Sequence, residues 1–248
     1  MVGIHPSEKM ANNYFQFKQF LVKQQMAAMK VTTDACLFGA WAAQNLSGRA
    51  DAKKILDIGA GTGLLSLMIA QQTTAMIDAI EIDQDAFIQS MENFQGSPWK
   101  ERLNILHGDI REAGLMQGYD VIVSNPPFYE NDLTGASRQK NIAHHDQGLL
   151  LKELVGIIHT LLHPEGHFYL LLPFRRLDDL RSLCSSAGLW IHRLCKVRQS
   201  TGHDFFRIMI EAGKTKATIT EEEIAIRDAG NAYTGRFISL LKPYYLYL

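Results

Sequence analysis

Two short segments carry residue types that could do chemistry, and each directly follows an apolar run. The first is Asp57 followed by glycines at every second position, Gly59, Gly61 and Gly63, before an apolar stretch with helical periodicity. This order is typical of a buried parallel strand, a tight turn and a helix, the start of a nucleotide-binding α/β unit. Glycines allow unusual backbone angles and let a ligand approach the backbone, just where the helix N-terminus offers unpaired N–H donors. The aspartate and the glycines therefore predict a ligand site.

The glycine spacing narrows the class of ligand. A dinucleotide-binding turn reads G-x-G-x-x-G and would need glycine at position 64, where the sequence has Leu64. The observed D-x-G-x-G-x-G resembles motif I of the class I S-adenosylmethionine-dependent methyltransferases. That resemblance implies that Asp57 and the glycine backbone bind the methionine part of this cofactor. The alternative is a glycine-rich strand-to-helix turn that binds no ligand.

The second segment is Ser124-Asn125-Pro126-Pro127-Phe128, after the apolar run at 119–124. Consecutive prolines lack N–H donors and hold the backbone extended, so their carbonyl groups and the Asn125 side chain can converge on one amino group. Two acceptors that pull on the N–H bonds of a planar amine localise its lone pair and stabilise the positive charge that develops during attack on a sulfonium methyl. Phe128 can stack on the base. The segment predicts catalysis at an exocyclic amine, with a simple Pro-Pro turn as the alternative.

Acidic residues after the next two predicted strands complete the expected cofactor site. Glu81 lies at the end of a strand predicted over 76–82, where a carboxylate can accept hydrogen bonds from both ribose hydroxyls of a nucleoside. Asp83, two residues later, is the alternative for this role. By resemblance to the same enzymes, Asp109 would accept a hydrogen bond from the adenine amine of the cofactor, and the alternative is an ordinary loop aspartate.

The elements that must position these residues alternate between strand and helix from residue 53 onward, which predicts an α/β fold with a doubly wound, mostly parallel sheet. The polar segment 198–204 is too short for a helical crossover, so the strands on either side of it should be antiparallel neighbours near the end of the sheet. A turn is expected at 163–166. Strands are expected at 54–58, 76–82, 103–107, 119–124, 167–172, 190–197 and 205–211, and helices at 64–71, 84–94, 149–162, 177–187 and 232–241.

Residues 1–47 are expected to form an N-terminal extension, with the methyltransferase domain at 48–248. Aromatic and polar residues alternate at 15–20, and with a turn at 23–25 and a returning strand at 26–31 this pattern predicts a hairpin. Thr33 or Asp34 is expected to cap a helix at 35–44. A lid that covers the sheet edge and a substrate-binding unit are both open as roles.

Composition limits the class of protein. The 248 residues suit one α/β domain, and 25 basic against 26 acidic residues give a net charge of −1, so any RNA contact must come from a local basic patch. Three cysteines without metal-ligand spacing (Cys36, Cys184, Cys195), no signal-peptide pattern and no bilayer-spanning apolar run predict a cytoplasmic protein without membrane contact. The pair His144-His145 has no further ligand at recognisable spacing, so no metal is expected. A monomer is favoured.

Three further features sharpen the resemblance to one family: the segments 15–20, 29–34 and 39–41, the run Ser97–Arg102, and the Tyr-rich tail. With the two motifs they resemble the bacterial tRNA(Val) (adenine-37 N6)-methyltransferases over nearly the whole chain. The resemblance implies a class I, Rossmann-like fold, S-adenosyl-L-methionine as cofactor and tRNA as partner. The reaction would be methylation of adenine N6 just 3′ of the anticodon. It also implies that Lys30, Thr33, Asp34 and Asn125 contact the cofactor.

Other activities stay open at this point. The second motif ends in Phe128 where tyrosine is frequent in this family, and phenylalanine is also usual in guanine-N2 RNA methyltransferases. Methylation of a protein glutamine has less support, because the release-factor enzymes carry a separate N-terminal helical domain. From another class, the chain could be a non-catalytic cofactor-binding RNA chaperone, although an intact Asn-Pro-Pro-Phe argues against it.

Basic residues on three segments are candidates for RNA phosphate contacts, and a solvated surface is the alternative for each. They are Lys18 on the N-terminal unit, with Lys23 and Lys30; Arg138, Lys140 and His144, with His145, on the loop after the second motif; and Arg175, Arg176 and Arg181 after the strand predicted at 167–172.

Overall fold

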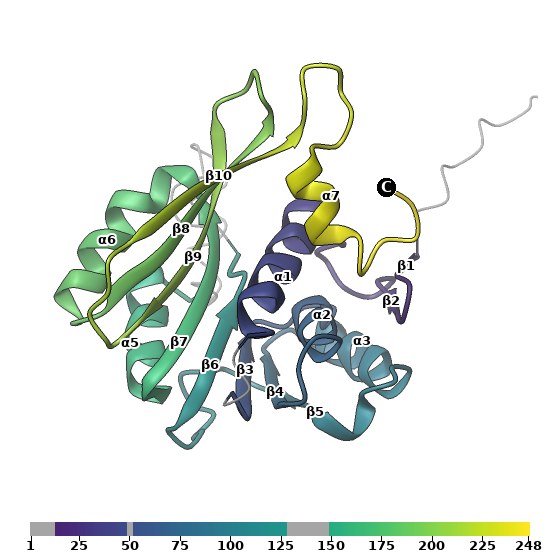
Figure 1. The fold of residues 1–248 in the computed structure, drawn as a ribbon. Coiled ribbons are helices and arrows are strands. Elements are labelled where there is room, and N and C mark those ends of the chain that lie inside the picture. The colour runs from purple at the N-terminus through teal and green to yellow at the C-terminus, as the bar shows by residue number, and fades with distance from the viewer. Residues whose placement is uncertain (1–12, 49–51, 128–148) are drawn as a thin grey trace, which may run out of the picture.

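An eight-stranded sheet forms the centre of the protein in a computed structural model that describes residues 13–48, 52–127 and 149–248. The strand order is β10-β8-β9-β7-β6-β3-β4-β5 (Figure 1), and β9 runs antiparallel to both of its neighbours while the other pairs are parallel. The predicted mostly parallel sheet with a reversed strand near its end is therefore confirmed. The strands are β3 (Lys54–Ile58), β4 (Met76–Glu81), β5 (Leu103–His107), β6 (Tyr119–Ser124), β7 (Leu162–Pro173), β8 (Trp190–Ser200), β9 (Phe205–Gly213) and β10 (Thr220–Arg227).

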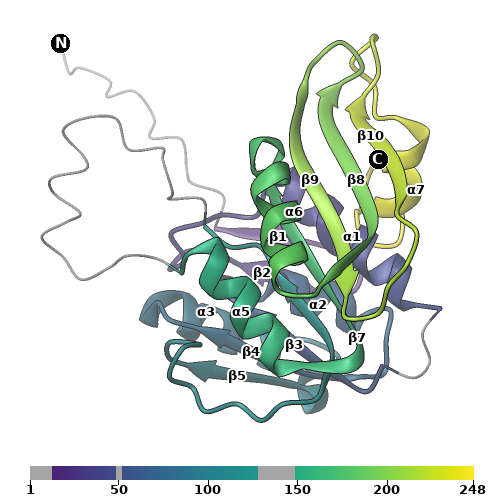
Figure 2. The same ribbon diagram turned by 90° about the vertical axis from the view of Figure 1, so that its left-hand side faces the viewer.

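Helices cover both faces of the sheet (Figures 1 and 2). On one face lie α1 (Thr33–Leu46), α2 (Leu64–Ala70), α3 (Gln84–Gln95) and α7 (Gly235–Leu241), and on the other lie α5 (Leu151–Leu161) and α6 (Leu177–Ser186). Because successive side chains of a strand point to opposite faces, β3 supplies Ile55 to the first core and Leu56 to the second. The same alternation turns Asp57 toward the face of α2. No helix among these described residues is long and apolar enough to cross a membrane.

Three neighbouring parallel strands bring both sequence motifs to one edge of the sheet. β3 pairs with β4 on one side and with β6 on the other, so that Ile58 lies opposite Ile80 and Ser124. The Ser124 hydroxyl donates a hydrogen bond of 2.7 Å to the carbonyl oxygen of Ile58, which ties the two strand ends together. The glycine turn, Glu81 and the Asn-Pro-Pro segment therefore leave the sheet side by side, at the carboxyl edge where open α/β sheets bind ligands.

The N-terminal hairpin is present but shorter than expected. β1 (Tyr14–Gln16) pairs with β2 (Leu21–Lys23), so the returning strand predicted at 26–31 is wrong. The turn comes early because Phe17 and Phe20 are buried in the core and stack on each other, with ring centroids 4.4 Å apart. The cap of α1 is also one residue earlier than predicted: the side chain of Thr32 accepts from the backbone N–H of Ala35, so Thr33 and Asp34 lie inside the helix.

Two differences concern the second half of the sheet. The turn predicted at 163–166 is wrong, because β7 already begins at Leu162 and runs through Pro164 and Gly166. A Cβ on Gly166 would lie 2.9 Å from the carbonyl oxygen of Tyr119, so glycine there allows close approach to β6. The edge strand β10 was not predicted. Three consecutive glutamates do not suggest a strand, but Glu221 and Glu223 form ion pairs with Lys196 and Arg198 of β8 at 2.8 and 2.7 Å.

Helix α1 shares a single core with α2, α7 and one face of the sheet. The domain boundary at residue 47 stays a prediction. The terminal helix α7 is shorter than the predicted 232–241, because Thr234 caps it and its first residue is Gly235.

Candidate active site

The glycine turn after β3 uses its three glycines for two different purposes. Gly59, Gly61 and Gly63 all have positive φ angles, of 74°, 57° and 78°. At Gly63 a Cβ would lie 2.5 Å from the ring of Phe94 on α3, whereas at Gly59 and Gly61 it would meet nothing within 4 Å. Gly63 is thus required by packing as well as by conformation. Gly59 and Gly61 leave the backbone open on the side where a ligand could lie.

Asp57 is fully buried beneath this turn. Its Oδ2 accepts hydrogen bonds from the backbone N–H and the hydroxyl of Ser66, at 3.2 and 2.7 Å. Its Oδ1 is buried and has no hydrogen-bond partner among the described residues. Burial raises the pKa of this carboxyl to about 7 despite the bonds from Ser66, and the nearby charge of Glu81 raises it further. A buried carboxylate oxygen needs a donor, and a cationic ammonium group such as that of the methionine moiety fits this need.

Ser66 was not singled out from the sequence. It stands at the third position of an apolar helix, where its hydroxyl points back at the preceding strand end. A polar residue on an otherwise fully buried helix face was the available signal.

Glu81 is buried at the end of β4. Its Oε2 accepts from the backbone N–H of Gly61 at 2.7 Å, and its Oε1 accepts from the backbone N–H of Asp83 at 2.9 Å. Each carboxylate oxygen retains a second acceptor position. Asp83, the alternative ribose-binding residue, instead caps α3 by accepting from the N–H of Ala86 at 2.8 Å. The geometry favours Glu81 over Asp83, and its contact with ribose stays a prediction.

Asp109 follows β5 at the same edge, and a neighbour already uses part of its hydrogen-bonding capacity. Its two carboxylate oxygens accept from Nε of Arg111 at 2.9 and 2.8 Å, and one also accepts from the Arg111 backbone N–H. This guanidinium holds the pKa of Asp109 below its usual range. Arg111 was not identified from the sequence, although a basic residue two positions after an acidic one is a simple signal. The adenine contact of Asp109 stays a prediction.

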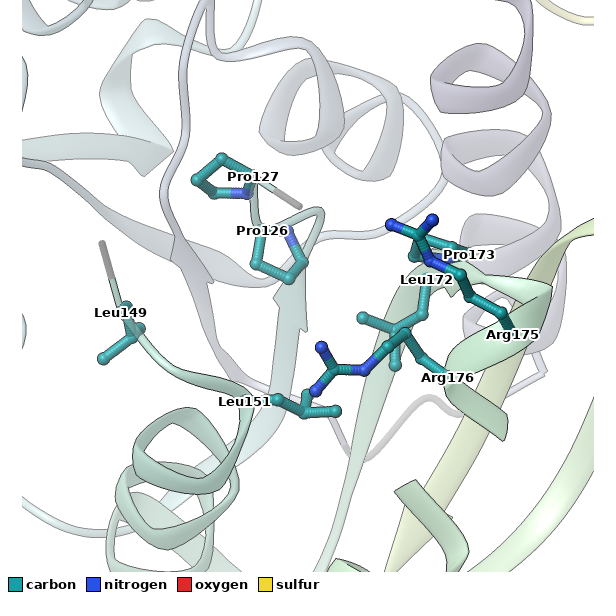
Figure 3. Close-up of a pocket in the computed structure, with 8 residues that line it drawn as sticks. All are labelled: Pro126, Pro127, Leu149, Leu151, Leu172, Pro173, Arg175 and Arg176. Atoms are coloured by element: carbon teal, nitrogen blue, oxygen red, sulfur yellow. The ribbon is translucent and has the colours of Figure 1, made fainter. Parts of the chain in front are cut away.

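The Asn-Pro-Pro segment directly follows β6. Asn125 is partly exposed, Pro126 is buried and Pro127 is exposed. The two prolines line a pocket with residues from the start of α5, the end of β7 and the short helix η2 (Phe174–Arg176), as Figure 3 shows: Leu149, Leu151, Leu172, Pro173, Arg175 and Arg176. Phe128, the last residue of the predicted catalytic group, lies outside the described residues, as do Arg138, Lys140 and His144.

The loop between β2 and α1 is anchored to α3, close to the glycine turn after β3. Asn93 of α3 accepts from the backbone N–H of Lys23 at 2.9 Å and donates to the carbonyl oxygen of Thr62 in the glycine turn at 2.8 Å. The backbone N–H of Met26 donates to the side chain of Gln89, also on α3, at 3.1 Å. Helix α3 therefore fixes the N-terminal unit and the glycine turn relative to each other.

Three of the predicted contact residues of the N-terminal unit have partners within the protein. Lys30 donates to the carbonyl oxygens of Gln24 and Ala27, which closes the loop on itself. Asp34 accepts from Nε of Arg207 on β9 at 2.8 Å, which places the start of α1 at the carboxyl edge, and Thr33 is exposed beside it. Lys18 donates to the carbonyl oxygen of Lys242 at the end of α7, at 2.6 Å. The proposed ligand contacts of these four residues, Lys18, Lys30, Thr33 and Asp34, stay predictions.

One group of potential metal ligands occurs in the described part of the chain, away from these strand ends. The ligand atoms of His167, His192 and Glu211 lie within 4.8 Å of one another. Glu211 already has an ion pair with Arg193, whose Nε is 3.2 Å from it. His167 stands opposite Val121, early in β6 and away from Ser124, where the Asn-Pro-Pro segment begins. The group is separate from the candidate active site.

The sequence is similar to known methyltransferases. Residues 40–153 match the model of the methyltransferase small domain. A protein of Dyadobacter fermentans named tRNA1(Val) (adenine(37)-N6)-methyltransferase is 42% identical over 95% of this chain and 98% of its own length. A protein of the same name from Tolumonas auensis is 36% identical over 96% of this chain and 98% of its own length.

Solved structures share the fold. A predicted O-methyltransferase from Agrobacterium tumefaciens has a TM-score of 0.65 at 19% identity, covering 85% of this chain and 96% of its own. A glycopeptide N-methyltransferase solved with S-adenosyl-L-methionine has a TM-score of 0.52 at 13% identity, covering 71% of this chain and 94% of its own. At these identities the likeness concerns the fold, and it confirms the predicted class I, Rossmann-like architecture.

Proposed function

The chain belongs to the family of the tRNA1(Val) (adenine(37)-N6)-methyltransferases, and from this premise we propose that it methylates the N6 amine of adenine 37 in a valine tRNA. The methyl donor is S-adenosyl-L-methionine, and the reaction takes place in the cytoplasm, where tRNA is found. The observation that carries the proposal is that the two sequence motifs lie side by side at the carboxyl edge of the sheet. Buried Asp57, whose Oδ1 has no hydrogen-bond partner in the part of the chain that the structure describes, and the Asn-Pro-Pro segment stand at the ends of two neighbouring strands that Ser124 ties together.

The residues of the cofactor half fit S-adenosyl-L-methionine. Asp57 would accept the ammonium group through Oδ1, and Gly59 and Gly61 would let the methionine part approach the backbone. Glu81 would accept from the ribose hydroxyls and Asp109 from the adenine amine. Lys30, Thr33 and Asp34 would contact the cofactor from the segment that leads into α1 and from its first turn. When bound, the cofactor supplies an electrophilic methyl group on a sulfonium sulfur.

The Asn-Pro-Pro segment would hold and activate the target amine. The Asn125 side-chain oxygen and a proline carbonyl oxygen would each accept a hydrogen bond from one N–H group of the amine. These two hydrogen bonds localise the lone pair of the amine on its nitrogen. As the nitrogen becomes tetrahedral and positively charged, the same two acceptors stabilise it more strongly than they stabilised the neutral amine. Phe128 would stack on the adenine. A Pro-Pro backbone is suited to this task because it is stiff and offers acceptors without competing donors.

Mapping of the methylated nucleotide tests the proposal. The protein is incubated with tritium-labelled S-adenosyl-L-methionine and total RNA, and the labelled RNA is digested and identified. We expect label at N6 of the adenine next to the anticodon of a valine tRNA. Label at guanine N2 would replace the base assignment, and transfer to protein glutamine or to no acceptor would overturn the proposal.

A further inference from the structure

Two arginines stand at the pocket that the Asn-Pro-Pro segment borders. Arg175 and Arg176 belong to η2, directly after β7, and Figure 3 shows both guanidinium groups reaching from η2 toward the pocket that Pro126 and Pro127 line. Every other described residue lining the pocket is a leucine or a proline. The catalytic motif therefore has a positively charged wall on the side of β7.

The fold holds η2 in a fixed place. The short helix follows the last residue of β7, and the ring of Phe174 packs against Phe205 of β9 with centroids 5.3 Å apart. The guanidinium group of Arg198, on β8, lies over the ring of Phe205, 4.0 Å from its centroid. Packing on three neighbouring strands limits the motion of η2, so its side chains keep their position relative to the motif.

The two arginines differ in exposure. Arg176 is mostly buried, and its Nε lies 3.1 Å from the carboxylate of Asp179 one turn later in α6. Arg175 is exposed. Arg176 is therefore suited to holding η2 against the pocket, while Arg175 is the more accessible of the two at this pocket.

A base that reacts at such a motif must leave its stack, and its flanking phosphates then lie close to the protein. Phosphate contacts by arginine fix the register of a nucleic acid, and the planar guanidinium can bind a phosphate through two hydrogen bonds. On this chemistry, and resting on the proposed function, we propose that Arg175 binds a backbone phosphate next to the target nucleotide. Arg175 is thereby a positioning residue for the RNA, and it has no contact with the methyl group or the cofactor.

The test compares Arg175→Ala with a matched control, Arg193→Ala. Arg193 is also an exposed arginine, but it lies near the start of β8, and its Nε is 3.2 Å from the carboxylate of Glu211. Arg175→Ala should weaken tRNA binding about tenfold, the effect of losing a charged hydrogen bond. It should also reduce the slope of log affinity against log salt by about one. Arg175→Lys should recover part of both effects, and affinity for S-adenosyl-L-methionine should be unchanged in all variants.

The kinetic readout separates positioning from folding. Arg175→Ala should raise KM for tRNA while kcat at saturating tRNA stays within a few-fold of wild type. Wild-type affinity and salt slope in Arg175→Ala, or an equal loss in Arg193→Ala, would overturn the inference. The binding titration needs no turnover. A wild-type protein that binds tRNA through Arg175 without methylating it would overturn the proposed function and leave the phosphate contact standing.

Discussion

The two halves of the carboxyl edge hold their functional groups in different ways. On the half formed by β3 and β4, Asp57 and Glu81 are buried and are held by residues at most 20 positions away in the sequence. On the half formed by β6 and β7, Asn125 and Pro127 are at least partly exposed. The pocket beside them is assembled from β7, η2 and α5, elements that begin 24 or more residues later.

The difference matches the proposed role of each half. A small cofactor can be surrounded by one strand–turn–helix unit, so the protein groups that would bind it are preorganised inside the protein at the cost of burying a carboxylate. A large RNA would reach the Asn-Pro-Pro segment from outside, in keeping with the exposure of Asn125 and Pro127 and with a pocket assembled from separate parts of the chain. We therefore expect changes on the first half to affect cofactor binding and changes on the second half to affect turnover and RNA binding.

The largest effect is expected from Asn125→Ala. Its side chain acts mainly when the amine becomes positive, so single-turnover methylation should slow by about 10²–10³-fold, as when one preorganised polar group facing developing charge is removed. Affinities for the cofactor and for tRNA should change far less. Single-turnover kinetics at saturating cofactor measures the rate, and calorimetry measures the cofactor affinity.

Asn104→Ala is the matched control for this variant. Asn104 lies on β5 and donates to the carboxylate of Asp78 at 3.1 Å, remote from the Asn-Pro-Pro segment in the strand order. It should methylate at the wild-type rate. An Asn125→Ala enzyme that did the same would remove the amine cradle, and with it the functional contrast between the two halves.

The next effect concerns Asp57 and is pH-dependent. Because burial raises the pKa of the unliganded carboxyl to about 7, a proton must leave before the ammonium group binds. The affinity for S-adenosyl-L-methionine should therefore fall about tenfold per pH unit below pH 7. It should also fall above about pH 8, where the α-amino group of the ligand itself loses its proton. Calorimetric titrations between pH 5.5 and 8.5 measure this profile.

The contribution of Asp57 to folding stability should change with pH in the opposite direction to cofactor affinity: it falls as the pH rises toward 7. The pKa of Asp57 in the folded protein is raised above its ordinary value of 3.8, so the folded protein binds the extra proton. This contribution to stability is fully present below that ordinary pKa and is lost as pH rises through about 7. Asp57→Asn should abolish the acid limb of the binding profile and weaken binding at pH 7.5 by about 10–100-fold, the effect of losing a charged hydrogen-bond partner. An unchanged profile in this variant would separate Asp57 from the cofactor.

The same contrast explains what the sequence could predict. The order of strands and helices and the motif around Asp57 are local patterns, and both led to the observed fold class and to the strand edge. Ser66, which donates two hydrogen bonds to Asp57, could not be picked out because a serine in a short apolar helix is common. β10 could not be predicted because its glutamates are stabilised in a strand by ion pairs with Lys196 and Arg198 on β8, and a sequence does not show this pairing.

The surroundings of the Asn-Pro-Pro segment depend on tertiary packing. Arg175 and Arg176 were recognised as basic, but a sequence cannot tell a solvated pair from one at the mouth of a pocket. Only the register of β7 against β6 brings η2 beside Pro126. The N-terminal turn likewise depends on burying Phe17 and Phe20, which an alternating pattern did not reveal.

A smaller effect should separate Glu81 from Asp83. Glu81→Gln keeps the shape but turns an amide N–H toward a backbone donor, so cofactor affinity should fall by about 1–2 kcal/mol. Asp83→Asn keeps the cap of α3, since asparagine caps helices as well as aspartate, and should bind the cofactor like wild type. Calorimetry on the pair measures the difference. The reverse outcome would assign the ribose contact to Asp83.

The smallest effect is expected from Lys18, which connects the N-terminal hairpin to the C-terminal tail. Its ammonium group donates to the carbonyl oxygen of Lys242, and such an exposed contact contributes no more than about 1 kcal/mol to stability. If Lys18 also binds a phosphate, Lys18→Ala should weaken tRNA binding by a few-fold and lower the salt slope by less than one unit. Lys100→Ala, an exposed lysine beside Glu101 on η1 (Lys100–Arg102), is the control and should leave the slope unchanged. A reduced free energy of unfolding with an unchanged slope would make Lys18 an anchor of the tail, and would confine the RNA contacts to the half of the edge that holds Asn125 and Arg175.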